Sequence, residues 1–151
     1  MLNFLLALLL MLIVALLWMM LYDTNRFVLV RHTFTDKRIR RDCRAVVLAD
    51  LHNKRYGRDN ELLIQAIREC APDMILVAGD LLTAVPGRSP EAAVRLLQEL
   101  KKDYPVYYAN GNHEHRLKLY PKTYGNMAEE YEDALQKLGI ERLVNTHVEL
   151  E

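Results

Sequence analysis

The chain has 151 residues, a formal net charge of zero and 51% apolar residues. This length allows one globular domain, and the balanced charge excludes a general electrostatic attraction to nucleic acid, so no nucleic-acid partner is expected. The two cysteines, Cys43 and Cys70, lack a CxxC spacing and therefore predict no disulfide scaffold.

The first predicted element is an apolar helix at the N-terminus. Residues 4–22 are apolar or aromatic without interruption. About 19 residues at ~1.5 Å each give roughly 28 Å of helix, close to the ~30 Å hydrocarbon core of a bilayer. A cleaved signal peptide needs a basic start, a shorter apolar run and small residues before the cut, and a buried core helix is rarely apolar all round for this length. We therefore predict a transmembrane anchor over residues 1–22.

A basic juxtamembrane connector is predicted over residues 23–42. Arginine and lysine occur after the anchor and not before it, which by the positive-inside tendency predicts a single-pass cell-membrane protein with a cytoplasmic soluble part. Residues 27–34 can form a short strand. The basic residues are interpreted as solvated surface, with binding to anionic lipid head groups as the alternative.

From residue 43 onward, apolar runs and amphipathic helices alternate. Buried strands are predicted at 44–50, 73–80 and 105–114, and a fourth begins in 143–151. Such a succession predicts an α/β fold with parallel neighbouring strands and helices over the sheet.

Three helices are predicted between these strands. The first is capped by Asn60, and the second starts at Ser89 followed by proline. The third starts at Asn126, with Glu129 completing a capping box, and ends before Gly139.

Each of the three complete apolar runs ends in residues of metal-ligand type: Asp50-Leu51-His52, Gly79-Asp80 and Gly111-Asn112-His113-Glu114. The carboxyl ends of parallel strands share one edge of a sheet, so these residues are predicted to converge. Period-2 geometry turns Asp50 and His52 to the same side if the strand continues that far. Oxygen and nitrogen donors suit Mn, Fe, Co or Zn, and Asp80 has two oxygens with which to bridge two ions. The alternative is that the aspartates are helix caps or turn formers.

The motifs D-x-H, G-D and G-N-H-E, in this order, resemble the first three motifs of the calcineurin-like metallophosphoesterases. The surrounding phrase ADLHNKRYGRDN…PDMILVAGDL…PVYYANGNHE looks like the membrane-associated bacterial branch of that family. The resemblance runs from about residue 44 to residue 114. It implies a four-layer αββα sandwich, of which residues 43–151 would be the N-terminal part.

The resemblance also implies roles for the residues that match the motifs. Asp50 and His52 would bind the first metal, Asp80 would bridge both, and Asn112 would bind the second. His113 would contact the phosphate and protonate the leaving oxygen, which makes it the expected catalytic residue.

Later histidine motifs of the family, including a G-H-x-H element, are missing from this sequence. The remaining histidines, His32, His115 and His147, lack a G-H context. His115 is predicted to lie on the surface and His147 to be half-buried in a strand. We therefore interpret the chain as truncated, with a poorly held second metal.

The predicted function is that of a membrane-anchored, metal-dependent phosphoric ester hydrolase using two divalent ions (Mn, Fe, Zn or Co), here as an incomplete and weakly active or inactive chain. Its substrate is a phosphate ester, with a lipid-linked phosphate as one candidate. The alternative is a catalytically inactive, membrane-anchored module that binds metal or a partner.

Overall fold

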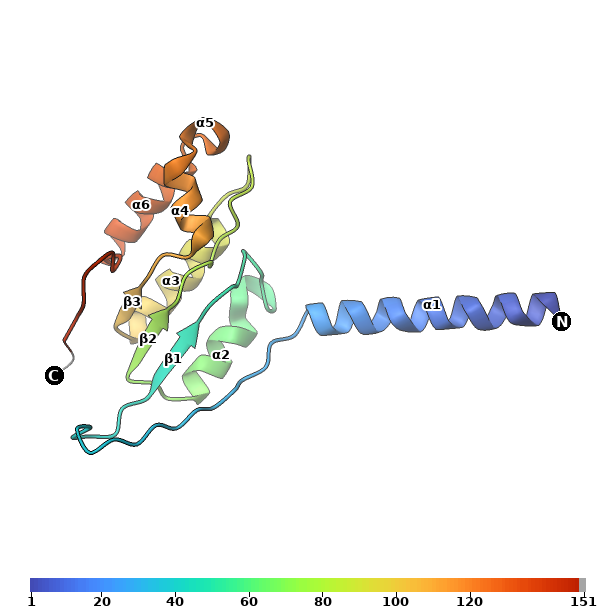
Figure 1. Ribbon diagram of the computed structural model, residues 1–151, viewed down its shortest axis with the longest axis horizontal. Helices are drawn as coiled ribbons and strands as arrows, with labels where there is room; N and C mark the ends of the chain where they lie inside the picture. The colour runs from blue at the N-terminus through green and yellow to red at the C-terminus, as the bar shows by residue number, and fades with distance from the viewer. Residues whose placement is uncertain (150–151) are drawn as a thin grey trace. The chain divides into compact units, whose positions relative to one another are not determined.

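The N-terminal unit is a single long helix followed by an extended segment. The computed structural model describes residues 1–149, which separate into two compact units, the first ending at Phe34. Helix α1 spans Leu2–Thr24 (Figure 1). None of its residues is buried. By length and composition it is the one helix among the described residues that can cross a membrane.

The prediction of a short strand at residues 27–34 is wrong, because these residues adopt no regular secondary structure. A strand outside a sheet lacks the ladder of inter-strand hydrogen bonds that would stabilise it. Among the described residues, the only sheet is the three-stranded one of the second unit.

The second unit is built around a small parallel sheet. Its strands are β1 (Ala45–Leu48), β2 (Met74–Val77) and β3 (Val106–Tyr108), in the spatial order β1-β2-β3. Both pairings are parallel, which confirms the predicted sheet direction. All three carboxyl ends therefore lie at the same edge (Figure 1).

The strand predicted at 143–151 does not form within the described residues. One parallel bridge joins Tyr108 to Arg142, and the backbone N–H of Leu143 donates to the Tyr108 carbonyl at 2.7 Å. The chain then runs on without strand pairing, and His147 is exposed rather than half-buried. Residues 150–151 of the predicted strand lie outside the described part.

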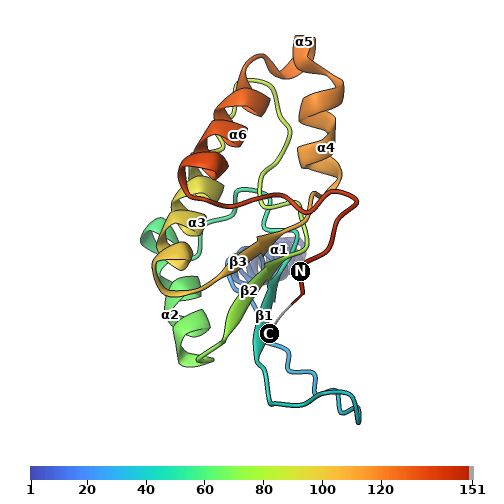
Figure 2. The same cartoon turned by 90° about the vertical axis from the view of Figure 1, so that its left-hand side faces the viewer.

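The three predicted helices are present as α2 (Glu61–Glu69), α3 (Glu91–Asp103) and α6 (Met127–Lys137), with a short 3₁₀ turn, η1 (Arg58–Asn60), before α2. Helices α2 and α3 cover the same face of the sheet in both views (Figures 1 and 2). Their apolar residues recur at helical spacing and supply much of the core: Leu63, Ile64, Ile67, Leu96, Leu97 and Leu100 are all buried.

Two of the predicted caps are wrong. Asn60 lies in the left-handed region (φ 66°) and makes no side-chain bond to the helix; its Oδ1 instead accepts from the backbone N–H of Tyr56 at 3.0 Å, which closes the preceding loop. Asn126 also makes no side-chain cap bond, so the predicted capping box is absent. Helix α3 begins at Glu91 with Pro90 at its N-cap, one residue later than predicted; the Ser89 hydroxyl still accepts from the N–H of Glu91 at 3.1 Å.

Two helices follow β3 where the sequence predicted the end of a strand and a connection. They are α4 (Asn112–Leu119) and α5 (Pro121–Tyr124). Residues 112–119 carry few apolar side chains and show little periodicity, so the sequence pattern gave no helical signal there. The consequence is that Asn112 and His113 lie in the first turn of a helix rather than on a strand.

One face of the sheet is apolar, and neither α2 nor α3 packs against it. In register across the three strands lie Val47, Leu76 and Tyr107. Val47 is 62% exposed, and the other two are half-buried. The described residues form a single sheet, so they do not make up the expected four-layer sandwich.

Candidate metal centre

The loops that follow β1 and β2 are joined to each other by backbone hydrogen bonds. The N–H of Asp50 donates to the Gly79 carbonyl at 3.2 Å, and the N–H of His52 donates to the Asp80 carbonyl at 2.9 Å. These bonds continue the association of the two strands past the end of the regular sheet. They set the distance between the two chain segments that carry the predicted ligands.

The backbone turns sharply at the predicted ligands. Asp50, His52 and Asp80 have φ angles of 55°, 49° and 54°, in the left-handed region that side-chain-bearing residues rarely adopt. Strand β1 ends at Leu48, so period-2 alternation does not explain how Asp50 and His52 come together. Their approach depends on these strained turns, and backbone strain of this kind is typical of functional sites.

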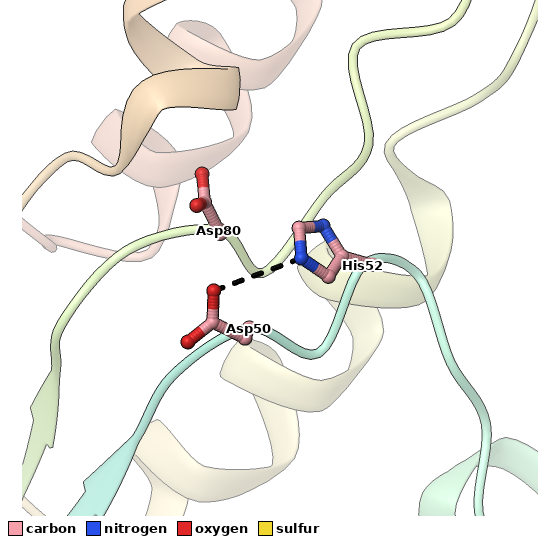
Figure 3. Close-up of side chains that lie close together, drawn as sticks. All are labelled: Asp50, His52 and Asp80. Atoms are coloured by element: carbon pink, nitrogen blue, oxygen red, sulfur yellow. Dashed lines mark ion pairs between the residues drawn. The ribbon is translucent and has the colours of Figure 1, made fainter. Parts of the chain in front are cut away.

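Three predicted ligands converge at this edge of the sheet (Figure 3). One ligand atom from each of Asp50, His52 and Asp80 lies within 4.8 Å of the others. The His52 Nε2 is 3.7 Å from the Asp50 Oδ1, and both side chains are partly exposed, whereas Asp80 is buried. The group thus combines two carboxylates and an imidazole and is open to solvent on one side.

The Asp80 carboxylate is fixed by the start of α4. Its Oδ1 accepts a hydrogen bond from the backbone N–H of His113 at 2.8 Å. The first turn of a helix has unpaired N–H groups and a partial positive charge, both of which stabilise a carboxylate. The side chain is therefore held in place without the help of an ion.

Asn112 lies directly against this carboxylate. With its NH₂ turned toward Asp80, it donates to Oδ1 at 3.2 Å and to Oδ2 at 2.5 Å. With its oxygen turned there, two acceptors face each other, and a cation between them removes the conflict. The NH₂-inward orientation satisfies both side chains, and rotation of the amide would let its oxygen face a cation instead.

His113 stands beside His52, with ring centroids 4.9 Å apart and the rings edge to face. Its Nδ1 accepts a hydrogen bond from the backbone N–H of Ala84 at 3.0 Å. A nitrogen that accepts in this way carries no proton, so the neutral ring has its proton on Nε2. The side chain can therefore donate through Nε2, while Nδ1 is already used.

The tips of β2 and β3 touch through glycine backbones. A Cβ on Gly79 would lie 2.2 Å from the Gly111 nitrogen, and a Cβ on Gly111 would lie 2.3 Å from the Asp80 Oδ1. No side chain fits between these segments. Glycine at both positions is what allows Asp80 and Asn112 to approach each other.

Glu114 is a component of this region to which the sequence assigned no role. Its side chain is fully buried (0% exposed). One carboxylate oxygen accepts from the backbone N–H groups of Asp80 (2.9 Å) and Gly111 (3.0 Å). The other accepts from the N–H of Leu81 (3.1 Å) and the hydroxyl of Tyr108 (2.8 Å). The only signal in the sequence is a glutamate three residues after Gly111, a spacing typical of helix starts, which the strand prediction for 105–114 obscured.

Two buried tyrosines complete the network around Glu114. The Tyr108 and Tyr131 hydroxyls lie 2.8 Å apart, and their rings meet edge to face. Burial, and then the neighbouring Tyr131 and Glu114, raise the pKa of Tyr108 far above its usual value. Burial likewise raises the pKa of Tyr131. Both phenols are therefore neutral hydrogen-bonding groups at ordinary pH.

The sequence profile of the Calcineurin-like phosphoesterase family matches residues 43–150. The chain belongs to this family. No curated protein and no solved structure matched it. Membership in the calcineurin-like phosphoesterase family implies hydrolase activity on phosphoesters, assisted by metal. The cluster of Asp50, His52 and Asp80 fits such a metal in its donor chemistry, because carboxylate oxygens and imidazole nitrogens are ligands for first-row divalent ions.

Proposed function

We propose that this member of the calcineurin-like phosphoesterases is a membrane-anchored hydrolase of phosphate esters that uses two divalent ions. The observation that carries the proposal is the convergence of Asp50, His52 and Asp80, within 4.8 Å, in a chain of this family. Asp50 and His52 would hold the first ion, Asp80 would bridge, and Asn112 would hold the second. When bound, the ions would polarise the phosphoryl group and acidify an attacking water.

The hydrogen bonds of the side chains support the roles proposed for them. The His113 N–H binds Oδ1 of Asp80, and the Asn112 amide is the group that faces Oδ2, so rotation of that amide would make Oδ2 available to a cation. Asn112 adds an oxygen without adding negative charge, so it does not repel a phosphate. Once the amide has turned, each of the two side chains would present an oxygen to a cation.

His113 is proposed as the general acid. The Ala84 N–H on Nδ1 fixes the neutral tautomer with its proton on Nε2. In this tautomer Nε2–H can hydrogen-bond to the leaving oxygen. To act as a general acid the ring must first take up a second proton on Nδ1, which breaks the Ala84 bond; the Nε2 proton then passes to the leaving oxygen as the phosphoester bond breaks, and the ring returns to its neutral form. General acid catalysis of this kind contributes about 10²–10⁴ in rate.

The membrane location is proposed from helix α1 and the basic residues that follow it. The helix is long and apolar enough to span, and the basic excess after it favours a cytoplasmic soluble part. A lipid-linked phosphate is therefore a candidate substrate. N-terminal sequencing of the membrane fraction should find residue 1, since no cleavage site is expected; mature protein starting after residue 20 would contradict the anchor.

We further propose that a longer form of the chain supplies the remaining metal ligands. The uncovered row of Val47, Leu76 and Tyr107 is an apolar surface of the kind that a second sheet covers. A G-H-x-H element encoded downstream would support this. An early stop codon would instead support the alternative, a module that binds metal or a partner without turnover, which the exposure of His115 and His147 favours for residues 1–149.

The proposed activity is tested with an aryl phosphate in detergent micelles containing Mn²⁺. Turnover should require the metal and should be lost in Asp80→Asn. Lys37→Gln, outside the site, is the matched control and should keep the wild-type rate. Absence of Mn²⁺-dependent turnover from both this chain and its longer form would refute the enzyme and leave the binding module.

A further inference from the structure

The loops that carry the candidate ligands share one acceptor. The Asp80–Leu81 loop and Gly111 come from different strand ends, some thirty residues apart in sequence. They approach without intervening side chains, since a Cβ on Gly111 would lie within 2.5 Å of the Asp80 nitrogen. Backbone N–H groups from both loops point at the Glu114 carboxylate and at no other acceptor that the described residues provide.

We infer that Glu114 is a positioning residue that sets the spacing of the Asp80 and Asn112 side chains and thereby the affinity of the metal centre. This inference rests on the proposed function and deepens it. The carboxylate oxygen that accepts from both Asp80 (2.9 Å) and Gly111 (3.0 Å) joins the residue that would bridge the ions to the residue just before Asn112. Glu114 does not touch the predicted ligand atoms, so it acts through the backbone alone.

Hydrogen bonds to the second carboxylate oxygen of Glu114 fix the orientation of the whole carboxylate group. It accepts from the Leu81 N–H at 3.1 Å and from the Tyr108 hydroxyl at 2.8 Å, and Tyr108 is in turn hydrogen-bonded to Tyr131. Four donors thus satisfy a carboxylate that has no access to water. Burying a carboxylate costs a great deal unless it is paired or fully hydrogen-bonded, and a fully satisfied buried network holds one geometry.

The substitution Glu114→Gln distinguishes a positioning role, which needs the hydrogen bonds of the carboxylate, from a packing role, which needs only its shape. Gln has nearly the same shape as Glu but only one acceptor oxygen. Its NH₂ group must face either the N–H groups of Asp80 and Gly111 or the N–H of Leu81. In each orientation at least one backbone N–H loses its acceptor, and the loop to which it belongs is released.

The experiment measures Mn²⁺ affinity by electron paramagnetic resonance on the whole chain in micelles, with hydrogen exchange of the peptide around Asp80 alongside. Glu114→Gln should weaken Mn²⁺ binding about 10–100-fold, the usual effect of losing a group that orients ligands. Exchange at Asp80 or Leu81 should become faster. Glu114→Asp keeps the charge but is one methylene shorter, so its affinity should fall between those of wild type and Glu114→Gln.

The matched control is Tyr131→Phe. It removes the last hydroxyl of the same buried network, and so lowers stability, but leaves all three backbone N–H bonds to Glu114 in place. Its Mn²⁺ affinity should equal that of the wild type. If Glu114→Gln lowers the unfolding midpoint but binds Mn²⁺ as tightly as wild type, Glu114 is only a structural residue and the inference is wrong.

The two proposals fail in different ways. A wild-type chain that binds no Mn²⁺ overturns the metal centre of the proposed function and the role of Glu114 with it. A wild-type chain that binds Mn²⁺, together with unchanged affinity in the Glu114 variants, overturns only the positioning role. If Glu114→Gln does not fold, the decision passes to Glu114→Asp: unchanged affinity there overturns the inference, and weakened affinity supports it.

Discussion

Replacement of Gly79 by alanine tests the backbone contact on which the candidate metal centre is built. Gly79 has a φ of +90°, and a Cβ there would lie 2.2 Å from the Gly111 nitrogen and 2.4 Å from its Cα. A left-handed backbone costs an alanine about 1–2 kcal/mol. Overpacking adds about 1–3 kcal/mol, and here the atoms that must move are backbone. We therefore expect Gly79→Ala to lower the free energy of unfolding by about 2–5 kcal/mol.

Gly87→Ala is the matched control for this substitution. Its φ of +74° is also left-handed, but no atom lies within 4 Å of the added Cβ. Its free energy of unfolding should fall only by the cost of the left-handed backbone, about 1–2 kcal/mol. The difference between the two variants isolates the contact between the tips of β2 and β3.

The assay is urea unfolding of the chain in micelles, followed by near-ultraviolet circular dichroism. At roughly 4 °C per kcal/mol, thermal melts should show a Tm lowered by about 8–20 °C for Gly79→Ala and by about 4–8 °C for Gly87→Ala. If the two variants lose the same free energy, the segments of Gly79 and Gly111 are not in contact, and the reasoning about the site's geometry is refuted.

Three further predictions concern the site and the buried tyrosines. Asp80→Asn should lower turnover at saturating Mn²⁺ more than Asn112→Ala does, because the proposed bridging position would lose charge at both ions; equal or reversed effects in steady-state kinetics would contradict the bridging role. His113→Ala should keep the metal content and lose about 10²–10⁴ in rate on an alkyl phosphate, but lose little on an aryl phosphate, whose leaving group hardly needs a proton. Equal losses on the two esters would reduce His113 to phosphate positioning. Since the folded pKa values of Tyr108 and Tyr131 are raised above 10.0, their stabilisation is fully present below pH 10 and is lost above it, by about 1.4 kcal/mol per pH unit for each tyrosine. Urea unfolding from pH 9 to 11 should show this slope reduced in Tyr131→Phe; an equal slope in both proteins would show that Tyr131 ionises as easily folded as unfolded.

The positions of the strands and of the main helices could be predicted from the sequence. Continuous apolar runs identified β1, β2 and β3, and residues at 3.6 spacing identified α2, α3 and α6. These patterns are local, because each reports which side of a segment is buried. The candidate ligands could be named for the same reason, since each lies just beyond an apolar run.

The failures fall where local pattern and tertiary environment differ. Residues 27–34 read as a strand but join no sheet, and the chain around residues 143–149 forms one bridge, at Arg142, and one backbone bond to Tyr108, from Leu143. Asn60 is a good cap by residue type, yet its side chain bonds to Tyr56 instead. In each case the local preference was overridden by the tertiary structure, because it determined which hydrogen-bonding groups were near enough to pair.

The sequence by itself determined the order of β and α segments, the parallel sheet and the identity of the candidate ligands. Only the tertiary structure decided how those ligands meet: through left-handed turns at Asp50 and Asp80, a helix that begins at Asn112, and an imidazole oriented by the N–H of Ala84. It also revealed the burial of Glu114 among donors from two loops and a strand. The physical reason is that hydrophobic periodicity records burial along one segment, whereas hydrogen bonds between residues some thirty positions apart exist only after the segments have packed.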